Sequence, residues 1–210
     1  MATLRGGPQA RHRIGALTPG SMKKEIALLD LGGVTFQSTG RTTAHIHWDV
    51  ITPLNYKYGH ALNVGEDLFP TFLKEYNQLT DQQLSGTEFL KSIFDLLDFN
   101  ATLLEGLRPH FKIVIVSENY RENIAYISQR YRFADWAMRQ IYSVDYQLVK
   151  ADDDFFPKVF HDLKDWHPEQ LFLVDDSPDK LASAAHCGIE GILYKTTEQA
   201  LAEVRRRFVI

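Results

Sequence analysis

The sequence has little cysteine, no long apolar run and little excess charge of either sign. Its one cysteine, Cys187, excludes an intramolecular disulfide and a cysteine-based zinc cluster, which favours a reducing, cytoplasmic location. No apolar run reaches the roughly 18 residues of a transmembrane helix, so we expect no membrane partner. The 23 basic and 27 acidic residues give a net charge of -4, so bulk charge favours no nucleic-acid partner.

The composition is otherwise ordinary. Of the 210 residues, 44% are hydrophobic and 24% are charged, which is typical of one globular domain or of one domain with an insert. Residues 1–24 contain arginine and lysine but no Asp or Glu, a bias that would also suit an organelle transit peptide. Because Gly20-Ser21-Met22 resembles a cloning scar, we expect residues 1–21 to be a tag or a disordered leader.

Short apolar runs recur along the rest of the chain and alternate with helical patterns. Their continuous apolar character is typical of strands that are buried on both faces. The runs are Ile26–Leu29, Ile113–Val116, Leu171–Val174 and Gly191–Tyr194, with a weaker one at Gln140–Ser143. The helical patterns cover about 119–131, 154–164, 178–187 and 196–208. This alternation predicts an α/β fold with a Rossmann-like parallel sheet flanked by helices.

The long interval between the first two runs breaks the alternation. It is far longer than a simple crossover needs, and helical patterns fill it near 43–60, 65–79, 86–98 and 100–108. We therefore predict a helical cap at 35–105, inserted after the first strand. The α/β core domain then comprises 22–34 and 106–210.

Polar side chains follow the predicted strands where each strand ends. Asp30, Ser117 and the pair Asp175-Asp176 come directly after strands, and Lys150 follows the weak strand in a loop. Ligands of open parallel sheets bind beyond these carboxyl ends. Alone, each residue is more often a helix cap, a turn residue or a surface charge. Together they predict a magnesium and phosphate site, because carboxylates suit Mg²⁺ whereas lysine and hydroxyl groups suit phosphate.

The same positions resemble the four motifs of the haloacid dehalogenase-like hydrolases. The motifs are Asp30-Leu31-Gly32-Gly33-Val34, Ile115-Val116-Ser117, Lys150-Ala151-Asp152 and Leu173-Val174-Asp175-Asp176-Ser177-Pro178-Asp179. The resemblance covers 24–210, and the insert resembles the helical cap of these hydrolases. The Asp-x-Gly-Gly-Val form is similar to a subgroup of sugar-phosphate phosphatases related to the epoxide hydrolase N-terminal domain.

The resemblance implies a Mg²⁺-dependent phosphatase that acts on a small phosphorylated metabolite such as a sugar phosphate. Asp30 would be the nucleophile and would form an aspartyl-phosphate, which divides one hard step into two easier ones. The implied metal ligands are Asp30, the backbone carbonyl of Gly32, Asp175 and Asp176. The implied phosphate-binding residues are Leu31, Gly32, Ser117, Glu118 and Lys150. Ser117 and Lys150 would also act in catalysis by stabilising charge on the transferring group.

The chain departs from the family pattern at the position of the general acid. Most phosphatases of this superfamily carry a second Asp two residues after the nucleophile, which protonates the leaving group and then activates water. Gly32 holds that position here, and general acid–base catalysis is worth roughly 10² to 10⁴-fold. A cap residue, a water on the metal, or an easily leaving group such as that of a sugar 1-phosphate could compensate. Two other departures are smaller. Glu118 stands where Asn is usual, and Lys180 stands where Asn or Asp is usual.

Other functions stay open at this point. A 2-haloacid dehalogenase would use the same nucleophile and also lacks the second Asp, but it needs no metal, which the pair Asp175-Asp176 suits. A non-catalytic binding module would agree with Gly32, Glu118 and Lys180. A phosphotransfer enzyme such as a mutase normally needs the missing Asp. The sequence does not distinguish a monomer from a homodimer.

Overall fold

The computed structural model describes residues 23–208, so the predicted leader at 1–21 lies outside the described residues. A five-stranded parallel sheet forms the centre, in the order β5-β4-β1-β6-β7. The strands are β1 (Ile26–Leu29), β4 (Lys112–Ser117), β5 (Arg139–Tyr142), β6 (Leu171–Asp175) and β7 (Glu190–Leu193). The predicted α/β fold with a parallel sheet is therefore confirmed.

The central strand β1 shows why its sequence is continuously apolar. Successive side chains of a strand point to opposite faces of the sheet. Ala27 and Leu29 join the hydrophobic cluster on one face, whereas Ile26 and Leu28 join the cluster on the other. All four side chains are fully buried. A polar residue at any of the four positions would therefore be buried without water.

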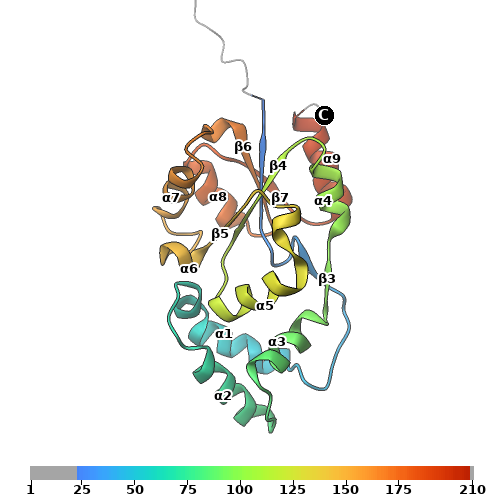
Figure 1. Ribbon diagram of the computed structural model, residues 1–210, viewed down its shortest axis with the longest axis vertical. Helices are drawn as coiled ribbons and strands as arrows, with labels where there is room; N and C mark the ends of the chain where they lie inside the picture. Colours follow the sequence, from blue (N-terminus) through green and yellow to red (C-terminus); the bar gives the residue numbers. More distant parts are fainter. Residues whose placement is uncertain (1–22, 209–210) are drawn as a thin grey trace, which may run out of the picture.

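Helices cover both faces of the sheet (Figure 1). On the face of Ala27 and Leu29, the cluster includes residues of α4 (Ala101–Leu107), α5 (Arg121–Tyr131) and α9 (Thr197–Phe208). On the opposite face it includes residues of α7 (Phe155–Asp162) and α8 (Pro178–His186). The short helix α6 (Ser143–Tyr146) directly follows β5, and single 3₁₀ turns occupy 133–135 and 168–170. Within 23–208, no helix combines the length and the apolar character needed to span a membrane.

The segment between β1 and β4 carries a separate group of helices at one end of the molecule (Figure 1). These are α1 (Trp48–Asn63), α2 (Phe69–Thr80) and α3 (Gly86–Phe94), and they share their own hydrophobic cluster. Two short strands, β2 (Phe36–Ser38) and β3 (Leu97–Phe99), flank the three helices and pair with each other. Because this pairing is antiparallel, it brings the two connecting segments together at the base of the helices.

Two features of this insert differ from the sequence prediction. The helix predicted at 86–98 ends at Phe94, because Leu97–Phe99 pairs with β2 as strand β3. The helix predicted near 100–108 is α4, and its leucines pack in the core beside the sheet. The predicted boundary between 105 and 106 therefore falls inside a helix that packs with the sheet, and the division into two domains stays a prediction.

Candidate active site

Three carboxylates meet at the carboxyl edge of the central strands. Asp30 directly follows β1, while Asp175 ends β6 and Asp176 follows it. The parallel register holds the two strand ends level, and the Asp30 N–H donates to the carbonyl of Val174 at 3.1 Å. Each carboxylate offers an oxygen that lies within 4.8 Å of those of the other two. Such a cluster repels itself unless cations lie close to it.

Lys150 supplies one such cation. Its Nζ lies 2.9 Å from Asp30 Oδ1 and 2.6 Å from Asp175 Oδ2, and its side chain is 0% exposed. Two carboxylates this close compensate for the hydration that a buried ammonium group loses. Its loop is held at two points: Glu118 Oε1 accepts from the Lys150 N–H at 2.7 Å, and Asp152 Oδ2 accepts from the Val149 N–H at 2.8 Å.

The environment of Asp175 shifts its ionisation. Burial raises the pKa of the Asp175 carboxyl above its usual value, because the charged form loses its hydration. The positive charge of Lys150 lowers this pKa, and the negative charge of Asp30 raises it again. The net direction is upward, and burial is its largest cause.

The formal charges of the side chains in and beside the cluster do not balance. Two ammonium groups, those of Lys150 and Lys180, lie near the carboxylates. The carboxylates are those of Asp30, Glu118, Asp175 and Asp176. Four negative and two positive charges leave a net charge of -2, which one divalent cation would balance. Hard oxygen ligands and this charge fit Mg²⁺.

The turn after β1 brings the backbone close to the cluster. Gly33 has φ +72°, and a Cβ there would lie 2.1 Å from Asp176 Oδ2, so only glycine fits. At Gly32, in contrast, an added Cβ would meet no atom within 4 Å. The hydrogen bonds of the turn use the carbonyl of Leu31 and the N–H of Gly33, which leaves both backbone groups of Gly32 outside it. Gly32 therefore keeps a backbone carbonyl and an N–H for a ligand.

Glu118 and Lys180, the two smaller departures from the family pattern, form an ion pair with each other. Lys180 Nζ lies 3.2 Å from Glu118 Oε2, and their side chains are 24% and 16% exposed. Burial by itself lowers the pKa of Lys180, but the negative charges of Asp30, Glu118 and Asp175 outweigh it, and the pKa is raised. The sequence identified each residue separately, but nothing in it indicates that they pair.

A cavity of about 610 Å³ lies between α1 and the loops at this edge of the sheet. From α1 it is lined by Asn55, Gly59, His60, Leu62 and Asn63. From the loops and helix starts it is lined by Glu118, Asn119, Tyr120, Asn123, Val149, Ala151, Ser177, Asp179 and Lys180. Residues on both sides of Lys150 and the residue after Asp176 thus face the cavity, which could hold the organic part of a ligand whose charged end reaches the carboxylates.

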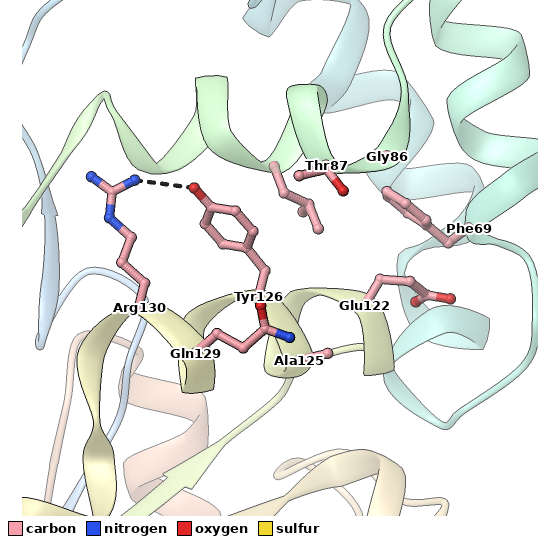
Figure 2. Close-up of a pocket in the computed structure, with 9 residues that line it drawn as sticks. Phe69, Gly86, Thr87, Glu122, Ala125, Tyr126, Gln129 and Arg130 are labelled. Carbon is pink, nitrogen blue, oxygen red and sulfur yellow. Dashed lines mark hydrogen bonds between the residues drawn. The ribbon is translucent and has the colours of Figure 1, made fainter.

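A second cavity, of about 470 Å³, lies between α3 and α5 and includes Phe69 of α2. Figure 2 shows Tyr126 and Arg130 of α5 in this space, where Arg130 donates to the Tyr126 hydroxyl at 3.0 Å. Arg130 also lies 3.1 Å from Asp95, at the end of α3. None of the predicted site residues lines this cavity. Of the residues predicted from the sequence, Glu118 lines the other cavity and Lys150 lies between two residues that line it.

The structure brings most of the predicted site residues together. Asp30, Lys150 and Asp175 are in direct contact, and Asp176 is in the same cluster. Ser117 ends β4, which neighbours β1, and its side chain is buried. Leu31 and Gly32 form the turn beside Asp30, and Glu118 holds the Lys150 loop. The roles assigned to these residues stay predictions.

Sequence reasoning assigned no role to two residues whose hydrogen bonds hold the backbone at Asp30 and beside Lys150. The hydroxyl of the fully buried Thr35 donates to the carbonyl of Asp30 at 2.7 Å. Asp152 holds the loop of Lys150, as described above. The only sequence signal for Thr35 is its position a few residues after a strand end, which many turn residues share. Asp152 belongs to the Lys150-Ala151-Asp152 motif, but the sequence assigned it no role.

Comparison with known proteins gives structural matches alone. No protein-family model matches the sequence, and no curated protein matches it. A HAD family enzyme from Bacteroides thetaiotaomicron, solved in complex with magnesium and inorganic phosphate, is similar with a TM-score of 0.62 and 17% identity. That match covers 82% of this chain and 94% of the other.

Two further solved structures are similar. A predicted HAD-like family hydrolase from Porphyromonas gingivalis matches with a TM-score of 0.62 and 17% identity, over 88% of this chain and 97% of that one. A 2-haloacid dehalogenase from Pseudomonas syringae pv. Tomato matches with a TM-score of 0.50 and 15% identity, over 81% of this chain and 86% of that one. At these identities the likeness shows that the chain shares the fold of HAD hydrolases.

Proposed function

We propose that this protein is a Mg²⁺-dependent phosphatase of small phosphorylated metabolites, working through an aspartyl-phosphate on Asp30. The observation that carries the proposal is the cluster of Asp30, Asp175 and Asp176 around the buried Lys150, with its net negative charge. A similar fold has been solved with magnesium and inorganic phosphate together, which supports this choice. The Asp-Leu-Gly-Gly-Val motif supports the finer proposal of a sugar-phosphate phosphatase of the epoxide hydrolase-related subgroup.

The residues have distinct roles in this proposal. Mg²⁺, held by Asp30, the carbonyl of Gly32 and the pair Asp175-Asp176, would neutralise the phosphate and polarise its oxygens. Asp30 attacks phosphorus, the bond from phosphorus to the ester oxygen breaks, and the alcohol leaves with a proton taken from water. A second water then hydrolyses the aspartyl-phosphate, which restores Asp30 and releases inorganic phosphate. Lys150 positions Asp30, because its Nζ lies 2.9 Å from the carboxylate. Ser117 and the backbone N–H groups of the two loops would hold the phosphate oxygens.

The empty position at Gly32 restricts the substrates. Because no side chain there can protonate the leaving oxygen, esters whose leaving group needs little help should react fastest. A sugar 1-phosphate is such an ester, since its anomeric oxygen leaves more easily than a primary alkoxide. The cavity beside the cluster, about 610 Å³ in volume, has room for a sugar. We therefore propose sugar 1-phosphates as the substrates to test first.

The test is phosphate release from a panel of esters, with sugar 1-phosphates and 6-phosphates side by side. Each ester is assayed with Mg²⁺, with a chelator and with the Asp30→Asn variant, and a 2-haloacid is included in parallel. We expect release that requires Mg²⁺, is faster for 1-phosphates and is lost in Asp30→Asn.

Other results would overturn the proposal. Halide release without metal would favour a dehalogenase. No reaction of a folded protein with any compound would favour a non-catalytic binding module.

A further inference from the structure

The ion pair of Glu118 and Lys180 joins two loops of the candidate active site. Glu118 follows β4, and Lys180 lies in the first turn of α8. Both line the cavity of about 610 Å³. Glu118 uses its two oxygens differently: Oε1 accepts from the Lys150 N–H, and Oε2 pairs with Lys180. One carboxylate thus positions the loop of the central lysine and also binds a second lysine.

Glu118 alone would be unfavourable at this place. Its carboxylate is only 16% exposed and directly follows Ser117, where the proposed function requires a phosphate. An unpaired negative charge close to that position would repel the phosphate, and low exposure reduces the screening by water. The site can accept an anion only if the charge of Glu118 is cancelled.

Lys180 is also at an unusual position by itself. Positive charges are disfavoured in the first turn of a helix, where the dipole is positive, and Lys180 lies in the first turn of α8. It is explained by the carboxylates it faces, since Asp30, Glu118 and Asp175 all raise its pKa. Glu118 is therefore unfavourable without Lys180, and Lys180 is stabilised by Glu118 together with Asp30 and Asp175.

We propose that Glu118 and Lys180 are a matched specificity pair for anion binding. Lys180 cancels the charge of Glu118 so that the site can hold a phosphate, while Glu118 positions the Lys150 loop. Lys180 is a positioning residue in this sense, because it acts through Glu118. The inference rests on the proposed function, since that function supplies the anion.

The test is a double-mutant cycle read out by the binding of inorganic phosphate in the presence of Mg²⁺, measured by calorimetry. Lys180→Met leaves Glu118 unpaired and should weaken phosphate binding by about tenfold or more. Glu118→Gln should bind phosphate at least as tightly as the parent, because Lys180 is then free and Gln can still accept from the Lys150 N–H. The phosphate affinity of the double variant should be within about threefold of that of the parent, because one negative and one positive charge are removed together.

Two controls accompany the cycle. Lys91→Met removes the same charge from exposed α3, where Lys91 pairs with Asp95 and is 64% exposed, and it should leave phosphate binding unchanged. Lys180→Arg keeps the charge and should retain binding, which provides a second test if Lys180→Met fails to fold.

The outcomes separate this inference from the function on which it rests. Suppose that the parent binds phosphate. If Lys180→Met then binds it equally well, or if the double variant binds it as weakly as Lys180→Met, the inference of a matched pair is wrong and the phosphatase proposal stands. If the parent neither binds phosphate with Mg²⁺ nor releases it from any ester, both are overturned.

Discussion

At the scale of single residues, the adjacent glycines 32 and 33 have different reasons to be glycine. At Gly33 the backbone has φ +72° and the carboxylate of Asp176 occupies the space of a Cβ. At Gly32 the same space is open and the backbone does not require glycine. Sequence alone gives two identical letters, so only the three-dimensional surroundings distinguish them.

The Gly33→Ala substitution should damage both the fold and the site. The positive φ costs an alanine about 1–2 kcal/mol, and the added methyl group must also displace Asp176. We expect the midpoint of urea unfolding to fall and phosphatase activity to drop by about tenfold or more. Gly40→Ala is the matched control, because Gly40 has φ +70° but no atom within 4 Å of its Cβ position. Equal activity loss in both variants would contradict the account of Gly33.

The Gly32→Asp substitution should add the general acid that the chain lacks. The open space around Gly32 allows a side chain, and a carboxyl group there could protonate the leaving oxygen. We expect kcat for primary alkyl phosphates to rise by up to about 10²-fold, with a smaller gain for sugar 1-phosphates. Gly32→Asn has the same shape without the acid and should show no gain. If Asn and Asp raise kcat equally, proton transfer is not the missing step.

At the scale of secondary-structure elements, Asn100 links the insert to the sheet. Its Nδ2 donates to the carbonyl of Val34 at 3.0 Å and to the hydroxyl of Tyr194 at 3.1 Å. Its Oδ1 accepts from the Leu103 N–H, as the N-cap of α4, and from the Thr197 hydroxyl. One buried amide therefore connects the turn after β1 with α4, with the residue after β7 and with α9.

Asn100→Ala should destabilise the protein by about 1–3 kcal/mol, because it leaves several buried groups without partners. The measurement is the free energy of unfolding in urea, and we expect the variant to unfold at a lower midpoint concentration of urea. Thr197→Val removes two bonds of the same network, those with Asn100 and Tyr194, whereas Asn100→Ala removes four, so Thr197→Val should cost less. A cost for Asn100→Ala no larger than that for Thr197→Val would show that the network is not what holds these elements together.

The elements also show which parts of the fold could be predicted. The runs around β1, β4 and β6 were found because a strand buried on both faces must be continuously apolar. The end of α3 was not predicted correctly. Leu97 continues the helical spacing of Leu90, Ile93 and Phe94, but its backbone pairs with β2. Pairing between residues about sixty positions apart overrides local periodicity, and no single-sequence pattern contains it.

At the scale of the whole molecule, the candidate site depends on chain topology. Asp30, Ser117 and Asp175 were predicted to meet because the carboxyl ends of parallel strands lie at one edge. The pairing of Glu118 with Lys180 was not predicted, because it depends on how two loops face each other. The net charge of the chain is -4, whereas the cluster concentrates its own excess of negative charge in one place.

This concentration of charge predicts that Mg²⁺ stabilises the folded protein. A ligand that binds the folded state alone adds about 2.7 kcal/mol at a concentration a hundred times its Kd. We expect the thermal midpoint to rise with Mg²⁺ and to return after chelation. Asp176→Asn should abolish most of the rise, whereas Asp98→Asn, an exposed residue on β3 paired with Arg41, should not. A rise that persists in Asp176→Asn would place the cation elsewhere.

The central claim is that Asp30 carries the phosphoryl group, and trapping that group tests it most directly. Without a side chain at position 32 to activate water, the second step should be slow and the aspartyl-phosphate should accumulate. The protein is mixed with substrate and Mg²⁺, quenched in acid within one turnover and digested, and the peptide that contains Asp30 is weighed by mass spectrometry. The account predicts one phosphoryl group on that peptide and none in Asp30→Asn. Phosphate release with an unmodified Asp30 peptide, or a phosphorylated peptide in Asp30→Asn, would contradict it.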